Sequence, residues 1–489
     1  MVSRSNRSHQ SHHTGNHKKL SIINSILLVL FTVLSAVTLF FVFAYDFLAF
    51  RGLNVIAAVV LIAIVLLSLV LILKKRASKF TFILLLLGSL AASGALYFLK
   101  SAIDMSDRMN QTASYSEVKM SVVVPKDSSV SKVADLKSVL APTGNDGTNI
   151  ASLISKIQTD EGVNLTTEAT DSYQSAYQSL QEDSSKAMVL NSAYNELLSQ
   201  TDENYKDKLK TIYSYTIKQK VASAKKKANR DVFNLYISGI DSYGSISSVS
   251  RSDVNIIMTV NRKTKKILLT TTPRDSYVPI ADGGNNQKDK LTHAGIYGID
   301  SSIHTLENLY DIDIDYYARI NFTSFITLVD LLGGIEVYND QAFTSHIGHY
   351  DFPVGKLKLN SEKALAFVRE RYSLEAGDND RGKNQEKVIA AIVDKLSSMK
   401  AVSNYNSIIK GLGKSIQTNM SLNTMMSLVN SQLESGSKYT VKSQALTGTG
   451  STGELTSYAM PNASLYMLSI DESSLAKAKD AINDTMDGK

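Results

Sequence analysis

The sequence contains no cysteine, and this absence excludes several kinds of protein. Without cysteine there is no disulfide framework and no thiolate chemistry. The chain also lacks a Walker lysine loop and the glycine-rich loop of protein kinases, so no motif in it predicts the use of a nucleotide. This composition fits an exported protein that does not depend on oxidative folding.

Acidic residues are almost missing from the first 79 residues, which contain nine Lys or Arg and a single acid, Asp46. This part therefore has a net charge of +8. Because the whole chain carries +6, the remaining 410 residues carry −2. A soluble part that is nearly neutral argues against a broad nucleic-acid-binding surface.

Three apolar runs without any charge follow a polar N-terminal tail, at residues 20–45, 52–73 and 80–99. Each has the roughly 20 residues that a helix needs to cross a bilayer. Three such runs separated by short loops fit membrane spans better than buried core helices. The first run is too long, and too closely followed by the others, for a cleaved signal peptide.

Basic residues before the first run and between the second and third predict the orientation of these spans, because basic loops stay in the cytoplasm. We interpret residues 1–19 as a cytoplasmic tail, disordered rather than metal-binding despite its four histidines, and residues 20–99 as three transmembrane helices. Everything after residue 99 is then outside the cell. The basic residues are Arg4, Arg7, Lys18, Lys19, Lys74, Lys75, Arg76 and Lys79.

Residues 100–228 are predicted to be an extracellular accessory domain with its linker. The pattern predicts a small α/β domain without a catalytic cluster, so we expect a role in spacing or partner contact. Its expected parts are a polar connector at 100–116, a strand at 119–124, a helix at 131–140, a loop at 143–148 and a basic linker at 218–230.

Residues 229–489 are predicted to be the catalytic domain. Strands at 232–240, 254–260 and 267–272 are followed by alternating helices and strands. This alternation is typical of an α/β fold in which helices cover a central sheet. Later expectations are helices at 405–412 and 473–486, a strand at 439–444 and a loop at 446–456.

A polar, arginine-rich stretch at 369–385 separates two predicted helices, 361–368 and 385–399. We expect Asp380 to cap the second helix, which would place Arg381 and Gln385 one turn apart on one face. Free backbone N–H groups at a helix start and arginine side chains both suit phosphate. The alternative is a solvated loop of surface ion pairs.

Two aspartates lie at the ends of neighbouring predicted strands, Asp241 after one and Asp253 before the next. Such carboxylates can share one Mg²⁺ (or Mn²⁺) with substrate phosphates, although each alone is compatible with turn capping. Many cations beside a divalent ion would suit a pyrophosphate whose leaving oxygen gains charge. The cations are Arg251, Arg274, Lys290, Arg369, Arg371 and Arg381.

Four segments carrying these residues resemble the motifs of the LytR–CpsA–Psr (LCP) family of cell-wall glycopolymer ligases: 234–244, 250–274, 290–295 and 364–385. The three spans and the accessory domain are similar to the streptococcal capsular members. The resemblance implies an α/β core with an apolar tunnel for a polyprenyl chain. It also implies a phosphotransferase that attaches polyprenyl-pyrophosphate-linked capsular polysaccharide to peptidoglycan and releases polyprenyl phosphate.

The same resemblance implies residue roles. Asp241 and Asp253 correspond to metal-site carboxylates, and Arg274, Arg369, Arg371, Arg381 and Gln385 to the pyrophosphate-binding set. Many members have arginine just before the glutamine, where this chain has Asn384, so head-group affinity is weaker unless Lys383 supplies the charge. Five apolar residues are equally compatible with the tunnel lining and with ordinary core: Ile256, Met258, Phe325, Leu328 and Leu332.

We therefore expect a Mg²⁺-dependent transferase in the cell membrane, with peptidoglycan, the lipid-linked polymer and other capsule-assembly membrane proteins as partners, and no nucleic acid. A lipid-pyrophosphate hydrolase would use the same residues. A membrane regulator of capsule expression is the other alternative. Its weakness is that the short cytoplasmic segments are too small for a folded DNA-binding module.

Overall fold

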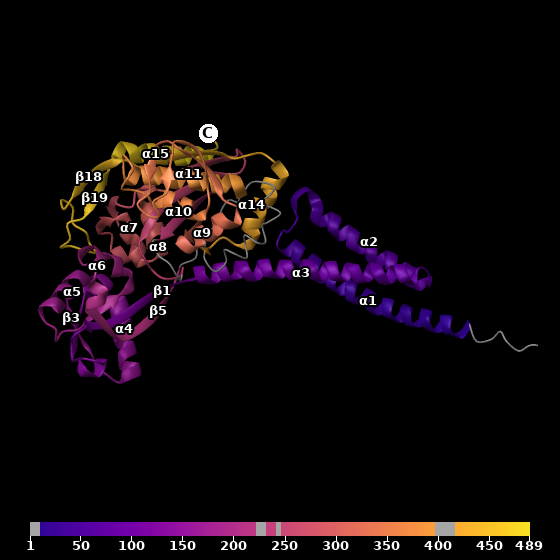
Figure 1. Ribbon diagram of the computed structural model, residues 1–489, viewed down its shortest axis with the longest axis horizontal. Coiled ribbons are helices and arrows are strands. Elements are labelled where there is room, and N and C mark those ends of the chain that lie inside the picture. The colour runs from indigo at the N-terminus through magenta and orange to yellow at the C-terminus, as the bar shows by residue number, and fades with distance from the viewer. Residues whose placement is uncertain (1–9, 222–230, 241–245, 397–415) are drawn as a thin grey trace, which may run out of the picture. The chain divides into compact units, whose positions relative to one another are not determined.

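The computed structural model describes residues 10–221, 231–240, 246–396 and 416–489, with side chains from Lys19 onward (Figure 1). The chain forms two compact units. The helical unit comprises Met1–Asp107 and Ser421–Ser437, and the α/β unit comprises Arg108–Met420 and Lys438–Lys489. The helix predicted at 405–412 lies outside the described residues.

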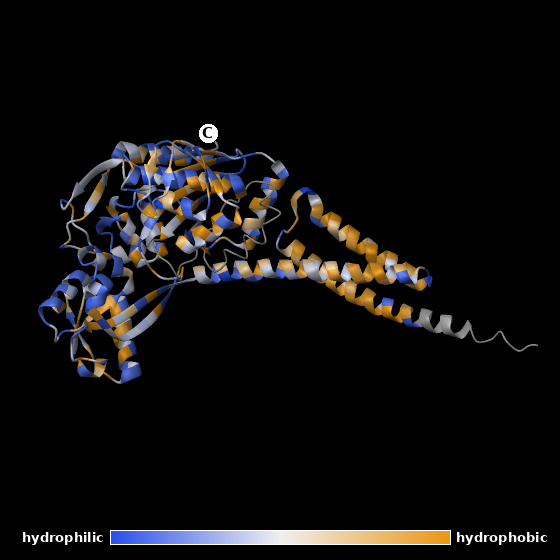
Figure 2. Cartoon of the chain, in the orientation of Figure 1, coloured by the Kyte–Doolittle hydropathy of each residue, from blue (hydrophilic) through white to orange (hydrophobic). Residues whose placement is uncertain are grey.

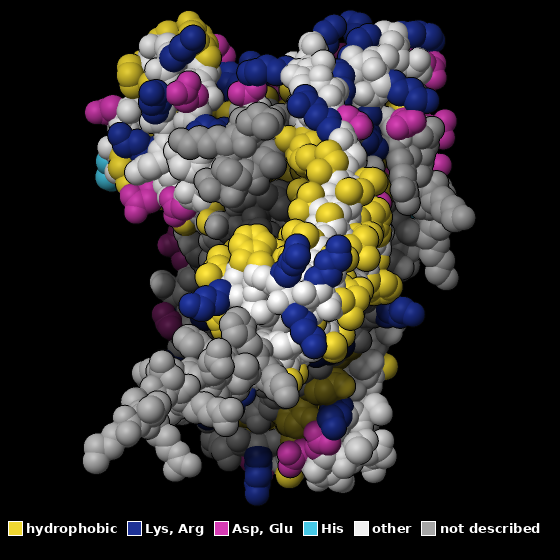
Figure 3. Space-filling view, turned by 90° about the vertical axis from the view of Figure 1, so that its right-hand side faces the viewer, with side chains coloured by type: hydrophobic (Ala, Val, Ile, Leu, Met, Phe, Trp, Pro, Cys, Tyr) yellow, Lys and Arg dark blue, Asp and Glu magenta, His cyan; other side chains and the backbone are white. Residues whose placement is uncertain are grey.

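Three helices of the helical unit are long and apolar enough to cross a membrane: Lys19–Ala44 within α1 (Gln10–Ala44), Phe50–Leu73 including α2 (Leu53–Leu73), and α3 (Ser78–Ala113). Most of their length is apolar, whereas the part of α3 that follows Lys100 is largely hydrophilic (Figure 2). Apolar side chains cover their surface, as lipid contact would require, with Lys and Arg side chains gathered beside them (Figure 3). The polar connector expected at 100–116 is instead largely helical, because α3 continues to Ala113.

Helix α14 (Leu422–Ser435) belongs to the helical unit although it lies far along the sequence. Its Asn423 donates a hydrogen bond to the Ala44 carbonyl at the end of α1 (3.1 Å), and Asn430 donates one to the Asp46 carbonyl (2.6 Å). The last carbonyls of a helix have no partner within the helix. Asn423 therefore satisfies a group at the end of the first apolar helix.

The accessory domain, residues 115–220, is a five-stranded sheet in the order β3-β2-β4-β1-β5. Its strands are β1 (Tyr115–Pro125), β2 (Ser138–Ala141), β3 (Thr166–Ala169), β4 (Met188–Asn191) and β5 (Leu209–Lys220). Its main helices are α4 (Thr143–Glu161), α5 (Tyr173–Glu182) and α6 (Asn195–Thr201).

Two local predictions for the accessory domain are wrong. The helix expected at 131–140 is a 3-10 turn (Val133–Asp135) followed by β2, because three successive buried residues pair with two neighbouring strands. A short buried apolar run is compatible with either state by periodicity alone. The loop expected at 143–148 is the start of α4, although Asp146 departs from helical geometry there (φ −140°).

The C-terminal domain, residues 232–420 and 438–489, contains a six-stranded sheet in the order β16-β11-β6-β7-β8-β17. The expected hairpin of β7 and β8 is confirmed, as are the strand at 439–444 and the terminal helix. The strands are β6 (Val232–Ile240), β7 (Ser252–Asn261), β8 (Lys266–Thr271), β11 (Tyr316–Ile320), β16 (Ile416–Thr418) and β17 (Thr440–Ala445).

Helices complete this α/β fold. Helices α8 (Ile299–Tyr310) and α15 (Glu472–Asp487) share a core with Tyr236, Ile257 and Leu268 of the sheet. A second core joins α9 (Phe322–Leu331), α10 (Ser361–Arg369) and α11 (Asp378–Leu396) to the hairpin of β12 (Ile335–Asn339) and β15 (Gly355–Leu359). The loop expected at 446–456 contains strand β18 (Gly448–Thr452), which pairs with β19 (Tyr466–Ile470).

The accessory and C-terminal domains share one hydrophobic core. Val249, Ile296, Ala459 and Met460 of the C-terminal domain are buried in the same cluster as the accessory side chains. The backbone continues the contact, since Glu117 N donates to Ser247 O (2.8 Å) and Val249 N to Glu117 O (3.0 Å). Neither domain therefore buries its apolar surface completely without the other.

Shortening Met460 tests this shared core. Met460 is 1% exposed, so Met460→Ala should lower the free energy of unfolding by about 2–5 kcal/mol, because buried contacts are lost and a cavity remains. Denaturant titration of the purified chain measures the change. Val354→Ala, at a 57% exposed position, is the control and should change stability by less than about 0.5 kcal/mol. A similar small effect at Met460 would contradict the shared core.

Candidate active site

A pocket of about 330 Å³ in the C-terminal domain collects most of the predicted site residues. Its polar side chains come from the β7–β8 hairpin and from the α10–α11 region, and its other wall is apolar. The predicted residues that line it are Asp253, Arg274, Arg369, Arg371, Arg381 and Gln385. The apolar wall includes Ile240, Val254, Ile320, Phe322, Phe325, Ile347, Leu365 and Val368.

The β7–β8 hairpin positions one ion pair of this pocket, that of Asp253 and Arg274. Ile256 of β7 pairs with Thr271 of β8 in the antiparallel register. Asp253 lies three residues before Ile256, and Arg274 lies three residues after Thr271. Both are therefore at the same end of the hairpin. The Arg274 Nη1 atom lies 2.6 Å from Asp253 Oδ2, and Thr292 Oγ1 donates to Asp253 Oδ1 (3.0 Å).

The charge of Asp253 is maintained by its cationic surroundings. Burial by itself would favour the neutral acid, but the charges of Arg274, Arg251 and Arg381 outweigh it and lower the pKa of Asp253. The carboxylate is therefore ionised at neutral pH. It can act as a cation ligand or accept a hydrogen bond from a substrate hydroxyl.

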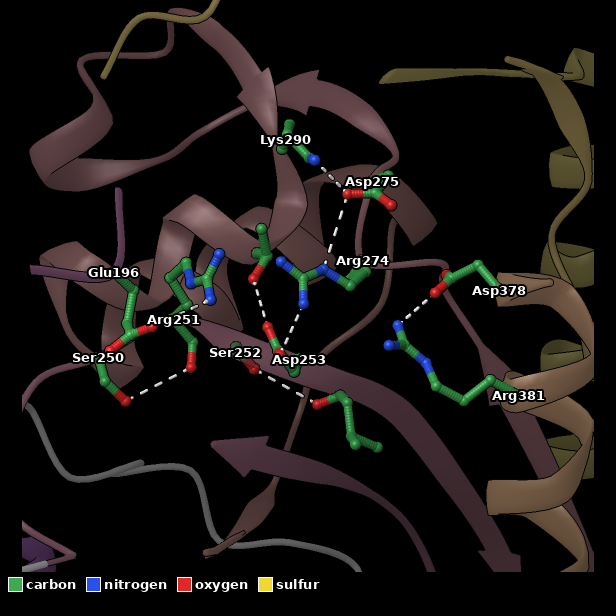
Figure 4. Close-up of polar contacts among 12 residues, drawn as sticks. Glu196, Ser250, Arg251, Ser252, Asp253, Arg274, Asp275, Lys290, Asp378 and Arg381 are labelled. Carbon is green, nitrogen blue, oxygen red and sulfur yellow. Dashed lines mark hydrogen bonds and ion pairs between the residues drawn. The ribbon is translucent and has the colours of Figure 1, made fainter. Parts of the chain in front are cut away.

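Two further charged side chains, Asp275 and Lys290, lie on the side of Arg274 away from Asp253 (Figure 4). Asp275 forms an ion pair with Lys290, and its Oδ1 atom also lies 3.6 Å from Arg274 Nε. Burial lowers the pKa of Lys290, and the neighbouring charges of Arg274 and Arg251 act in the same direction, against the attraction of Asp275. Lys290 does not line the pocket. It is better described as a support for Arg274 than as a direct phosphate ligand.

Arg251 is also outside the pocket lining. It is 7% exposed, and it has an ionic partner in the accessory domain, because Arg251 Nη2 lies 4.0 Å from Glu196 Oε2 (Figure 4). The accessory helix α6 thus contributes a carboxylate beside the arginine cluster. No local pattern connects Glu196 with Arg251, which lies 55 residues later in the chain.

Helix α11 contributes Arg381, which forms an ion pair with Asp378 one turn earlier (Figure 4). Burial raises the pKa of Asp378, while the charge of Arg381 opposes the shift. The expectation that Asp380 caps this helix is wrong, because α11 begins at Asp378 and Asp380 lies in its first turn. There Asp380 accepts a hydrogen bond from Ala376 N (2.9 Å). Arg381 and Gln385 are nevertheless one turn apart, and both line the pocket.

Aromatic side chains position two other arginines. The Arg369 guanidinium lies 4.0 Å from the centre of the Phe322 ring, and the Arg371 guanidinium 5.0 Å from that of Tyr372. Stacking of this kind orients an arginine without removing its hydrogen-bond donors. Phe322 is itself fixed at the start of α9 by Asn321, whose side chain accepts a hydrogen bond from Ser324 N (2.9 Å).

The structure distinguishes between the apolar candidates. Phe325 lines the pocket, whereas Ile256, Met258, Leu328 and Leu332 do not; the first three of these are buried and Leu332 is half-buried. The sequence analysis did not identify Phe322, because a large apolar residue is ordinarily expected in the hydrophobic core. It also missed Asp378, because its pairing with Arg381 depended on where α11 begins.

Asn384, at the position where many family members have arginine, is buried and does not line the pocket. Its neighbour Lys383 lies 2.8 Å from Asp380 Oδ1 and does not line the pocket either. Lys383 is therefore committed to an ion pair and does not replace a missing pocket charge. Within the described parts of the chain, the cations that line this pocket are Arg274, Arg369, Arg371 and Arg381.

The donor set near Asp253 can be compared with the needs of a divalent cation. Among the residues that the structure describes, no group of three or more His, Asp or Glu side chains could hold a metal ion. Each Asp253 oxygen accepts one hydrogen bond, which leaves lone pairs for a cation. Mg²⁺ needs only one or two carboxylates when substrate phosphates complete its shell. Asp253 fits that role, while Asp241 lies outside the described residues.

Next to Gln385, the buried Glu386 gives α11 a pH-dependent contact with the sheet. Burial raises the pKa of Glu386 to about 7, although hydrogen bonds such as that from Thr271 Oγ1 (2.5 Å) oppose the shift. The folded chain thus keeps a proton that the unfolded chain, with an ordinary pKa of 4.5, releases. Stability from this proton is complete below about pH 4.5 and is lost as the pH rises through 7.

Glu386→Gln is expected to remove this dependence. Between pH 5 and pH 8 the free energy of unfolding of the native chain should fall by roughly 2–3 kcal/mol more than that of the variant. Denaturant titrations at the two pH values measure the difference. Glu182→Gln, at an exposed position, is the control and should keep the native pH dependence. An unchanged profile in Glu386→Gln would contradict the assignment.

Comparison with protein families identifies this domain. The model described as LytR_cpsA_psr family matches residues 189–482, more than half of the chain. The chain belongs to the LytR_cpsA_psr family. A second model, described as DNA polymerase processivity factor, matches residues 75–190. That range begins before the apolar helix α3 and ends within the accessory sheet, so it corresponds to no single structural unit, and we derive no function from it.

Relatives within the LytR_cpsA_psr family carry a named activity. The chain is 34% identical over 264 residues to an Enterococcus faecalis polyisoprenyl-teichoic acid–peptidoglycan teichoic acid transferase, TagU, covering 53% of this chain and 82% of that protein. TagU of Bacillus licheniformis is 31% identical over 260 residues, covering 52% and 79%. The crystal structure of Bacillus subtilis TagV is 26% identical, with a TM-score of 0.45, and covers 53% of this chain and 99% of that one.

Proposed function

We propose that this protein transfers a glycopolymer from a polyprenyl pyrophosphate carrier to peptidoglycan and releases polyprenyl phosphate. The observation that carries the proposal is the pocket itself, in which four arginines and one ionised aspartate face an apolar wall. Such a pocket suits a ligand with a doubly charged head group and a hydrocarbon tail. The transferase names of the family relatives support the same class of reaction.

The arginines would hold the pyrophosphate, and the apolar wall would take the first part of the polyprenyl chain. Arg274, Arg369 and Arg381 approach from different elements, so they can contact both phosphates at once. Positive charge at these positions stabilises the leaving phosphate as its negative charge develops. Phe322 and Asp253 assist by fixing the orientation of two of these guanidinium groups.

In the proposed step, the acceptor hydroxyl oxygen attacks the phosphorus atom that carries the sugar polymer. A new P–O bond forms, the P–O bond to the bridging oxygen breaks, and polyprenyl phosphate leaves with that oxygen. An aspartate, Asp253 or Asp241, orients the hydroxyl and receives its proton. The product is a phosphodiester between polymer and peptidoglycan.

A divalent cation, Mg²⁺ or Mn²⁺, belongs to the proposal. Asp253 and Asp241 would hold it, and it would supply charge neutralisation for the phosphate oxygens. Of these ligands the described structure contains Asp253, whose remaining lone pairs suit the role. The arginines and Asp253 would still bind and orient the pyrophosphate through their own contacts.

We also propose that the polymer is a capsular polysaccharide and that other capsule-assembly membrane proteins are partners. The site would work outside the cell, with the N-terminus in the cytoplasm. The supporting observations are the three apolar helices and the basic residues between the second and third. Basic loops remain on the cytoplasmic side, so the chain after α3 would be exported.

A reconstituted reaction tests the proposed function. Full-length protein in detergent is mixed with a polyprenyl-pyrophosphate oligosaccharide, peptidoglycan fragments and Mg²⁺, and the products are identified by mass spectrometry. The full chain is needed because the two domains share a core. A phosphodiester-linked saccharide–peptidoglycan product that disappears with EDTA is expected. Free saccharide phosphate alone would indicate a hydrolase, and no turnover with retained lipid would reject a transferase.

A further inference from the structure

A second pocket, of about 460 Å³, lies where the accessory domain meets the C-terminal domain within the α/β unit. The start of α4 forms one side of it, and the segment 283–297 of the C-terminal domain forms the other. The pocket shares no lining residue with the arginine pocket. The proposed reaction therefore does not account for it.

The accessory side of this pocket is a built polar network around Asp146. Tyr173 donates its hydroxyl to Asp146 (2.6 Å), and the side-chain amides of Asn191 (2.8 Å) and Asn149 (2.6 Å) donate to the same carboxylate. Gln219 donates to Asn149 (2.7 Å). Each bond restricts a rotamer, so the polar groups facing the pocket have fixed positions before a ligand arrives.

Two tyrosine hydroxyls in this pocket have unused hydrogen-bonding capacity. Tyr194, 3% exposed, and Tyr297 come close enough to influence each other, but neither hydroxyl has a hydrogen-bond partner of ordinary length among the described residues. A buried hydroxyl without a partner is costly by about 1–3 kcal/mol. The two hydroxyls interact with each other and are buried, so a ligand with hydroxyl groups would pair with them after a small movement of either ring.

The charge of the pocket identifies the kind of ligand. Of the described residues that line it, Asp146 is the one with a charged side chain, and its carboxylate is already engaged by three donors. No described lining residue is Lys or Arg, which argues against phosphate. Tyrosine, asparagine, glutamine and threonine side chains instead suit a ligand rich in hydroxyls. We propose that this pocket binds an uncharged segment of a saccharide chain.

This inference rests on the proposed function for the source of the saccharide, and a short segment connects the two pockets. Thr292 contacts Asp253 at the arginine pocket, and five residues later Tyr297 lines the second pocket. A glycan held by Tyr297 would thus lie against the same short segment that contacts the reacting groups. The saccharide is either the peptidoglycan acceptor or the polymer being transferred, and both share the chemistry that the pocket recognises.

Binding measurements on full-length protein in detergent test the site directly. The probes are a peptide-free peptidoglycan glycan fragment and a phosphate-free oligosaccharide of the polymer repeat, titrated by calorimetry. Tyr194→Phe should weaken binding of one of them about three- to tenfold, since it removes one hydroxyl contact. Gly144→Phe should abolish it, because Gly144 lines the pocket and a Cβ there meets no atom within 4 Å.

Matched variants separate this inference from the proposed function. Tyr215→Phe changes a tyrosine of the same domain outside the pocket and should bind normally, as should Arg381→Ala, which alters the other pocket. Which probe binds tells acceptor from polymer. If neither binds, or if Tyr194→Phe and Gly144→Phe bind like the native chain, the inference is wrong even when transfer is observed. Binding that needs Tyr194 in a protein without transfer activity would reject the proposed function alone.

Discussion

Replacing Arg381 with alanine is expected to lower the rate of glycopolymer transfer by roughly 10²–10³-fold. Arg381 lines the pocket from α11, facing the Asp253–Arg274 pair that the β7–β8 hairpin provides. In the proposed reaction, a guanidinium at this position would contact the pyrophosphate most strongly when the leaving oxygen is gaining charge. The loss should therefore appear mainly in kcat, measured from phosphodiester product formed per minute.

The protein should still fold after Arg381→Ala, because the carboxyl group of Asp378 can become neutral. Burial already raises the pKa of Asp378, and Arg381 is the largest influence in the other direction. Without that arginine the carboxyl can take up a proton rather than remain buried and charged. Lys387→Ala is the matched control, since Lys387 is on the same helix, pairs with Asp340 (2.5 Å) and lies outside the pocket. Transfer within threefold of native in Arg381→Ala would contradict the assigned role.

Asp253→Asn is expected to have a comparable effect, a loss of at least about 10²-fold in transfer. The substitution keeps the size of the side chain but removes the negative charge that pairs with Arg274, and it replaces one of the two oxygens that accept from Arg274 and Thr292 by an NH₂ donor. It also removes the described carboxylate that would hold a divalent cation. Residual activity should no longer respond to added Mg²⁺, which a titration from zero to millimolar concentrations measures.

The control for Asp253 is another aspartate with a lysine partner. Asp394→Asn breaks an exposed pair with Lys438 (2.9 Å), where exposed pairs contribute little to stability. This variant should transfer polymer at the native rate and keep its Mg²⁺ response. If Asp253→Asn behaved in the same way, Asp253 would be a structural partner of Arg274 rather than part of the reaction.

The elements that the sequence predicts well are those with strong local patterns. The β7–β8 hairpin follows from two apolar runs around a polar turn, and its register brings Asp253 to Arg274. The arginine stretch was recognisable because its cations are concentrated between two periodic helices. The structure brings Arg369, Arg371, Arg381 and Gln385 of this stretch together in one pocket, and their function stays a prediction.

The features that escaped prediction depend on contacts between distant residues. Phe322 stacks on Arg369, which lies 47 residues later in the sequence. From its size and apolar character alone, Phe322 would be expected in the hydrophobic core. Strand β2 is stabilised by pairing on both sides, which its sequence cannot indicate. Tyr194 and Tyr297 meet only after two domains have packed together. Such features arise from tertiary structure, so one sequence read locally does not reveal them.

The shared core also has an evolutionary consequence. Because Ala459 and Met460 complete the interior of the accessory domain, a chain without that domain would leave both side chains uncovered. We therefore expect apolar side chains in the segment around residues 457–463 to occur together with the accessory domain. A family member without an accessory domain would have to shorten this segment or make it polar. The presence or absence of the accessory domain should therefore correlate with the length and polarity of a loop more than 200 residues away from it.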